Sequence, residues 1–102
     1  MRAAVLVLAL AACARQMPPM ATQLDAERGH VELAQLTEGR TLLVHKCGTC
    51  HQPPLPIAHG KIEWPKMLDE MAQRSNLDTR ERSLILQYLV VMTDAPPPIA
   101  KR

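Results

Sequence analysis

Three segments in the middle of the chain carry apolar residues at helical spacing. The first covers about residues 31–46, and the second covers about residues 65–74 and begins with a proline at a first-turn position, where its missing N–H does no harm. The third covers about residues 79–92. The apolar stripes of the first and third segments consist of Leu33, Leu36, Leu43 and Val44, and of Leu84, Ile85, Tyr88, Val91 and Met92. Because strand signals are absent, the pattern predicts an all-α fold of about three helices.

Two local signals refine these helices. Asp78, followed by Glu81 three residues later, is typical of a capping box that begins the third helix. Gly39 lies inside the first helix, where glycine is unfavourable by about 1 kcal/mol relative to alanine. A glycine at such a position predicts that another helix crosses closely there. Residues 52–60, between the first two helices, contain three prolines and are expected to form an irregular loop.

The N-terminus has the features of a secretory leader. Arg2 is followed by an apolar run from Ala3 to Ala12, which is too short to span a bilayer as a helix but suits the core of a signal peptide. The run ends in Leu-Ala-Ala-Cys, which resembles the lipobox of bacterial lipoproteins, so Cys13 is expected to be lipidated and to become the first mature residue. The alternative is an ordinary signal peptide with an incidental cysteine.

These signals divide the chain into four parts. We expect a signal peptide at residues 1–12, a lipid-anchored tether at 13–29, a folded domain at 30–94 and an extended tail at 95–102. A pair of prolines interrupts the tether, and three consecutive prolines in the tail prevent any continuation of the last helix.

Composition changes the expectation for the core and for the partners. The chain of 102 residues has no Phe, one Trp and one Tyr, so the aromatic filling of an ordinary small core is missing. A domain of this size is only marginally stable, and a large apolar cofactor would supply what is missing. The 12 Lys and Arg residues nearly balance the 10 Asp and Glu residues, which gives no case for a nucleic-acid partner.

The chemistry of the chain is concentrated in the stretch Cys47-Gly48-Thr49-Cys50-His51. Two cysteines at i and i+3, followed directly by a histidine, form the attachment pattern of a c-type haem. On a helical turn these positions share one face, so both sulfurs reach the two vinyl groups at one edge of a porphyrin. His51 can then bring an imidazole nitrogen to the iron. The single copy of this motif predicts one covalently bound haem c.

Thiol redox chemistry and zinc binding are the alternatives to haem for these cysteines. A thiol redox pair is expected near the first strand of a βαβ pattern, which the sequence lacks. A zinc site would combine Cys47 and Cys50 with two of His45, His51 and His59, but structural zinc sites usually bring their ligands as two separated pairs. Covalent haem therefore explains the motif best.

The residues around the motif resemble those of the small monohaem class I-like cytochromes c. Residues 38–43 resemble that family's first helix, in which a glycine contacts the last helix, and residues 84–89 resemble the last helix. Trp64, seven residues before Met71, resembles the subset in which a tryptophan precedes the methionine ligand. The resemblance covers about residues 31–93 and implies a class I-like fold around one haem.

The sixth iron ligand is expected to be a methionine, whose neutral thioether favours the reduced metal and raises the potential. Met67 and Met71 lie four residues apart on the second predicted helix, so they share a face; one would bind and the other would pack. The resemblance favours Met71, with Met67 as the alternative. A histidine ligand or an open site is the further alternative: His59 is the loop candidate, His45 is too close to the motif, and His30 is expected at the surface.

The resemblance also implies supporting residues. A ligating histidine donates its other ring N–H to a fixed acceptor, and in the family a downstream proline carbonyl has this role, which makes Pro54 or Pro56 the expected acceptor for His51. The indole N–H of Trp64 is expected either to bind a haem propionate or to serve in packing alone. Further candidates for pairing with the propionates are Arg40, Lys61 and Arg74.

Together these features predict an electron-transfer protein rather than an enzyme, because a six-coordinate iron changes oxidation state without binding a substrate. The expected location is the periplasmic side of a membrane, and the expected partners are periplasmic or membrane redox proteins that contact a monomer or a redox-complex subunit. One alternative is a haem domain with a weak or open distal site that binds small molecules or gas. Another is a dedicated haem subunit of a periplasmic oxidoreductase complex.

Overall fold

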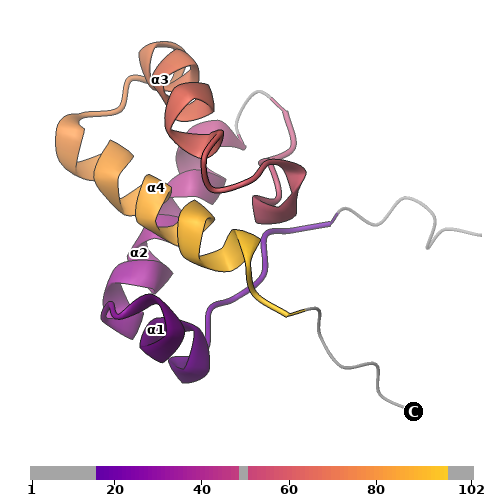
Figure 1. Cartoon of the computed structure of the whole chain (residues 1–102). Coiled ribbons are helices and arrows are strands. Elements are labelled where there is room, and N and C mark those ends of the chain that lie inside the picture. The colour runs from indigo at the N-terminus through magenta and orange to yellow at the C-terminus, as the bar shows by residue number, and fades with distance from the viewer. Residues whose placement is uncertain (1–15, 49–50, 97–102) are drawn as a thin grey trace, which may run out of the picture.

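The computed structural model describes residues 16–48 and 51–96, and all regular structure in these ranges is helical. The elements in chain order are α1 (Gln23–Gly29), α2 (Leu33–Cys47), the 3-10 turn η2 (Pro56–Ala58), α3 (Trp64–Ser75) and α4 (Thr79–Thr93). Figure 1 shows α4 lying across α2, with α1 near one end of this pair and α3 near the other. The prediction of an all-α fold is confirmed for this part of the chain.

The three predicted helices are present as α2, α3 and α4, with bounds close to the predicted ones. Pro65 occupies the first turn of α3, as expected. At the start of α4, the Glu81 N–H donates to the Asp78 carboxylate at 2.8 Å, and the Asp78 N–H donates to the Glu81 carboxylate at 3.1 Å. These two hydrogen bonds form the predicted capping box and confirm where the third helix begins.

The close helix crossing predicted at Gly39 is also confirmed. A Cβ atom placed on Gly39 would lie 2.9 Å from Cβ of Tyr88 and closer still to the carbonyl oxygen of Leu84. These distances leave no room for a side chain, so glycine allows α4 to pass directly over α2. The crossing fixes the position of the C-terminal end of α2, which carries Cys47.

The core lies mainly between α2, α3 and α4. The chain has no Phe, one Trp and one Tyr, and both Trp64 and Tyr88 are fully buried. The aliphatic side chains that are also fully buried are Leu36, Leu43, Leu68, Ile85 and Leu89. Burying each large apolar side chain stabilises the fold by about 1.5–3 kcal/mol, so these few residues provide most of the apolar stabilisation.

Residues 23–29, which the sequence places in the tether, form the helix α1 instead. A capping box begins this helix: the Thr22 N–H donates to the Asp25 carboxylate at 2.8 Å, and the Asp25 N–H donates to the Thr22 hydroxyl at 3.3 Å. Arg28 in the last turn donates to the carbonyl of Val91 on α4 at 2.9 Å. The prediction that residues 23–29 belong to a tether is therefore corrected. Capping and packing make this segment helical, although it is too short to show a clear helical period of apolar residues in the sequence.

Residues 16–22, which precede α1, lie along the domain and are called the N-terminal strap below (Figure 1). Pro18 is fully buried. The Pro18 carbonyl accepts a hydrogen bond from Nε of Arg40 at 2.8 Å, and the Pro19 carbonyl accepts one from the hydroxyl of Tyr88. The two prolines expected to interrupt a tether thus bind to the helical core.

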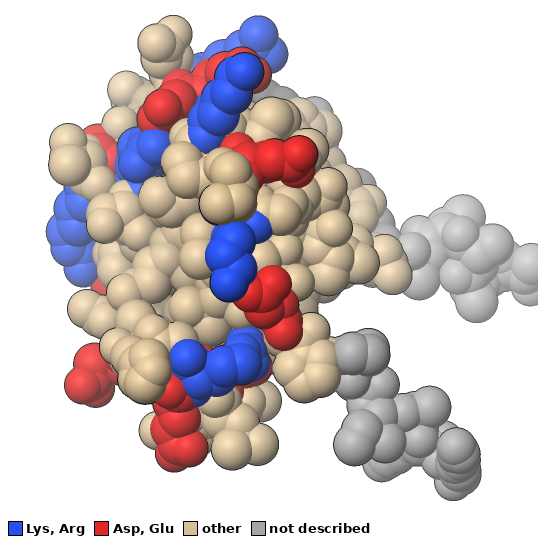
Figure 2. Space-filling view, viewed as in Figure 1, with Lys and Arg blue, Asp and Glu red and all other residues tan. Residues whose placement is uncertain are grey.

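Acidic and basic side chains are interspersed on the face of the molecule seen in Figure 2. The ion pairs of the described residues include Arg80 with Glu38 at 2.8 Å and Lys61 with Asp94 at 2.6 Å. Both pairs are exposed, so each contributes at most about 1 kcal/mol.

The predicted signal peptide at residues 1–12, the lipobox cysteine Cys13 and residues 97–102 of the predicted tail lie outside the described residues. Within the described ranges, none of the helices has the length and apolar character needed to cross a bilayer.

Candidate functional site

One cavity of about 440 Å³ brings together three residues that the sequence identifies as cofactor ligands. Cys47 at the end of α2, His51 in the following loop and Met71 on α3 all line it. The other residues that line it are His45, Lys46, Arg74, Ser75 and Asn76. The volume lies within the range of small-molecule and cofactor sites. Residues from two helices and a loop therefore meet at a single site.

Cys47 is the last residue of α2, and only 4% of its surface is exposed. Burial raises the pKa of the Cys47 thiol, and a hydrogen bond with the Ser75 hydroxyl, at the end of α3, offsets this rise only in part. The thiol is therefore protonated at neutral pH. Thr49 and Cys50, the next residues of the motif, lie outside the described ranges.

His51 is exposed, and its Nδ1 atom lies 2.9 Å from the main-chain carbonyl oxygen of Gln52. Because a carbonyl oxygen can only accept, Nδ1 carries the hydrogen in this contact, and Nε2 of the neutral ring keeps its lone pair. This tautomer leaves Nε2 free to bind a metal. The expected acceptor, a carbonyl of Pro54 or Pro56, is not the one used, since Gln52 directly follows His51 and its carbonyl is already within reach.

The last turns of α3 face the motif. Met71 and Ser75 lie four residues apart, so they share one side of the helix, and both line the cavity. Met67, one turn earlier, is half-buried and packs against the core, but it does not line the cavity. Of the two candidate methionines, Met71 is the one that shares a cavity with Cys47 and His51.

Trp64 at the start of α3 is fully buried, and its indole N–H donates to the carbonyl of Pro56 at 3.0 Å. The ring of His59 meets the indole edge-on, with ring centroids 4.9 Å apart, and its Nδ1 lies 3.5 Å from the Glu63 carboxylate. Neither Trp64 nor His59 lines the cavity. In this structure the indole N–H of Trp64 is bound by a backbone carbonyl, and the choice between its two expected roles stays a prediction.

The basic residues considered as partners for cofactor carboxylates occupy different places. Arg74 lines the cavity. Arg40 instead donates to a carbonyl of the N-terminal strap at 2.8 Å, and Lys61 pairs with Asp94 at 2.6 Å. Arg74 is therefore the member of this set that the structure brings to the site.

His45 and Lys46, in the last turn of α2, also line the cavity. From the sequence, His45 is a candidate zinc ligand and an unsuitable distal ligand for iron, and Lys46 has no predicted role. Lys46 lies 3.5 Å from the carboxylate of Glu81 on α4, which links the end of α2 to the start of α4. Both residues directly precede Cys47, and this position in the sequence could have identified them as residues that line the cavity.

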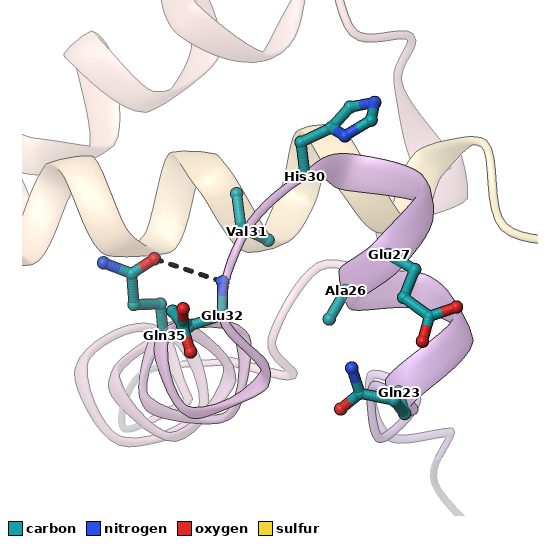
Figure 3. A pocket seen from close by; sticks show the side chains of 7 residues that line it. All are labelled: Gln23, Ala26, Glu27, His30, Val31, Glu32 and Gln35. Carbon is teal, nitrogen blue, oxygen red and sulfur yellow. Dashed lines mark hydrogen bonds between the residues drawn. The ribbon is translucent and has the colours of Figure 1, made fainter.

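A second cavity, of about 430 Å³, lies between α1 and the start of α2 (Figure 3). Its lining residues are Gln23, Ala26, Glu27, His30, Val31, Glu32 and Gln35. Figure 3 shows the Gln35 side chain turned back toward the main-chain nitrogen of Glu32, which donates to it at 3.5 Å. His30 is exposed, as expected. In residues 16–48 and 51–96, no three His, Cys, Asp or Glu side chains come together as a metal site.

Comparisons of the chain with protein-family models, with curated proteins and with solved structures found no match. The interpretation of the site therefore depends on its own residues. A thiol, an imidazole whose Nε2 is free and a thioether surround one cavity, and this donor set fits the covalent haem that the sequence predicts.

Proposed function

We propose that this chain is an exported c-type cytochrome that carries one electron and is not itself an enzyme. The observation that supports the proposal best is the position of Met71 in the same cavity as Cys47 and His51. Zinc sites are built from thiolate, imidazole and carboxylate ligands, whereas a thioether opposite a histidine is a ligand pair of electron-carrying haem. The cavity therefore favours haem over the zinc and thiol-redox alternatives.

Four residues would hold the cofactor. Cys47 and Cys50 would hold it through thioether bonds, and His51 and Met71 would bind its iron, with Met67 as the alternative to Met71. Haem held by these residues would supply one-electron redox chemistry.

The protein groups around these ligands have definable roles. The hydrogen bond from Nδ1 of His51 to a backbone carbonyl orients the imidazole and makes Nε2 a better donor. The neutral thioether of Met71 favours the reduced state, which raises the potential. Arg74 supplies positive charge at the cavity, where it would partly balance the carboxylates of the cofactor.

We also propose that the helices form the class I-like cytochrome c fold. Two observations support this assignment. The helix that ends at the attachment motif and the last helix of the fold cross at Gly39, as the resemblance implies. The helix between them carries Met71.

The proposed location is the periplasmic side of a membrane, after export by residues 1–12 and lipidation of Cys13. The partners would be periplasmic or membrane redox proteins that make small, transient contacts. His45, His51 and Arg74 are exposed side chains at the cavity, so a partner has access to this side of the domain.

The first test is the absorption spectrum of protein that has been exported and matured by a cytochrome c assembly system. A haemochrome spectrum with one haem per chain is expected. A colourless mature protein would contradict the proposal. Carbon monoxide added to the reduced protein tests the open-site alternative, because a closed His/Met site takes it up slowly or not at all.

The second test compares Met71→Ala with Met67→Ala. Loss of the sulfur-to-iron charge-transfer band is expected in the Met71 variant, together with a lower potential, because the neutral thioether ligand is removed. Met67→Ala is the matched control, since it removes the same side chain one turn away. Loss of the band in the Met67 variant alone would assign the ligand to Met67.

A further inference from the structure

The N-terminal strap reaches the loop that carries His51. Nε2 of Gln52 donates to the carbonyl oxygen of Gln16, the first described residue of the strap, at 2.8 Å. The main-chain carbonyl of the same Gln52 accepts the hydrogen bond from Nδ1 of His51 at 2.9 Å. Gln52 therefore connects the strap to the imidazole ring.

The strap is fixed to the helical core by contacts further along the chain. Pro18 is fully buried, and its carbonyl and that of Pro19 accept hydrogen bonds from Arg40 and Tyr88. These two donors come from α2 and α4, the helices whose crossing organises the fold. The strap is thus attached through Pro18 and Pro19 to the most extensive helix contact of the described residues, and through its first residue to Gln52.

The rest of the loop has its own anchors. Pro53 and Pro56 are buried. Pro53 packs closely against Gly48, so that a Cβ atom added to Gly48 would lie 3.3 Å from Cγ of Pro53. His51 and Gln52 are exposed, and Gln52 uses its side-chain amide to bind the strap. The strap therefore supports the part of the loop that precedes the buried prolines.

We propose that the N-terminal strap is a positioning element for His51. Arg40 and Tyr88 hold the strap, the strap holds Gln52, and the carbonyl of Gln52 orients the imidazole. The inference rests on the proposed function, in which His51 is an iron ligand. Arg40 and Tyr88 do not line the cavity, so they are positioning residues that act through the strap.

The test compares three variants of the full, matured chain. Arg40→Leu removes the donor to the strap, Arg40→Lys keeps a donor and the charge, and Arg80→Leu removes the same charge from an exposed residue that pairs with Glu38. Two readouts are used: hydrogen exchange of the peptide covering residues 51–58, and the haem methyl shifts of the oxidised protein, which report the orientation of the axial imidazole.

Arg40→Leu is expected to increase the exchange of this peptide by about 2- to 10-fold, the effect of losing one hydrogen bond, and to move the methyl shifts. Arg40→Lys and Arg80→Leu should match the wild type in both. Wild-type exchange and wild-type shifts in Arg40→Leu would overturn the inference while leaving the haem assignment intact. A colourless protein would overturn the proposed function, and the exchange of the same peptide would still report whether the strap holds the loop.

Gln52→Leu provides a second route if Arg40→Leu does not fold. Gln52 is exposed, so its replacement should not disturb the core, and it cuts the connection itself. Exchange of residues 51–58 is expected to rise as in Arg40→Leu, and adding Arg40→Leu should then change it no further, because both substitutions break one chain of contacts. Unchanged exchange in Gln52→Leu, or additive effects in the double variant, would overturn the inference.

Discussion

At Gly39 the usual preference for alanine over glycine in a helix is reversed. Alanine is favoured in helix interiors by about 1 kcal/mol, but a Cβ atom here would lie 2.9 Å from Cβ of Tyr88. Gly39→Ala is therefore expected to force α2 and α4 apart and to lower the free energy of unfolding by about 1–3 kcal/mol. Urea denaturation followed by circular dichroism measures this change.

Gly60→Ala is the matched control for this substitution. A Cβ atom on Gly60 would meet nothing within 4 Å, and the residue does not have a positive φ. Its unfolding free energy should stay close to that of the wild type, within about 0.5 kcal/mol. A Gly39→Ala protein as stable as the Gly60→Ala protein would show that the crossing tolerates a side chain.

Tyr88 makes the stability of the domain sensitive to alkaline pH. Burial raises the pKa of the Tyr88 hydroxyl, and the nearby Arg40 only partly opposes this rise. In the unfolded chain the hydroxyl titrates near its ordinary pKa of about 10, so above that pH the unfolded state loses its proton first. The contribution of Tyr88 to stability is thus constant below about pH 10 and falls above it, by up to about 1.4 kcal/mol per pH unit.

Tyr88→Phe should remove this alkaline loss. At neutral pH the same substitution should cost about 0.5–1.5 kcal/mol, because the hydrogen bond to the Pro19 carbonyl is lost. Urea denaturation of both proteins at a series of pH values gives the two slopes. Since the chain has one tyrosine, equal slopes in the two proteins would show that this hydroxyl is not the group responsible.

The sequence identified the site at the level of residue types, but it did not identify all of the contacts between them. The motif and the Trp64–Met71 spacing were enough to select residues that the structure places around one cavity. The acceptor for His51 was missed because the geometry of the loop puts the adjacent Gln52 carbonyl within 2.9 Å of Nδ1. The sequence left two roles open for Trp64, because the acceptor of its indole N–H depends on the direction of the Pro56 carbonyl, which the sequence does not show.

Among the elements, the longer helices were predictable and α1 was not. α2 and α4 each have 15 residues, enough turns for the apolar period to be visible, and the Asp78 cap marks the start of α4. α1 has 7 residues and follows two prolines, so its period is too short to distinguish it from a linker. The Thr22 and Asp25 capping pair was the local signal that was overlooked.

The capping box of α1 gives a prediction at the level of the element. Thr22→Ala removes the hydroxyl that accepts from the Asp25 N–H, so α1 should lose about 0.5–2 kcal/mol of local stability. Hydrogen exchange of peptides from α1 should become faster, while exchange in α3 should not change. Thr37→Ala, at an exposed position inside α2, is the control and should leave α1 as it is. Unchanged α1 exchange in Thr22→Ala would show that packing alone holds the helix.

For the whole molecule, the small core of the described residues implies that the proposed haem would contribute much of the stability. Only a few large side chains are fully buried, and a cavity of about 440 Å³ lies between the ends of α2 and α3. The double variant Cys47→Ala, Cys50→Ala, which cannot attach haem covalently, should therefore melt at least about 10 °C below the matured protein. Thermal unfolding followed by far-UV circular dichroism checks this, and equal melting temperatures would show that the helices need no cofactor.

If Cys13 is lipidated as proposed, the N-terminal strap would also limit how far the domain can travel from a bilayer. Two residues separate Cys13 from Gln16, so the intervening chain spans at most about 11 Å. With a lipid on Cys13, the domain would therefore be held close to the membrane surface, with the His51 loop near the lipid attachment site. It would not diffuse through the periplasm on a long flexible linker. Its electrons would pass to and from proteins embedded in that same bilayer.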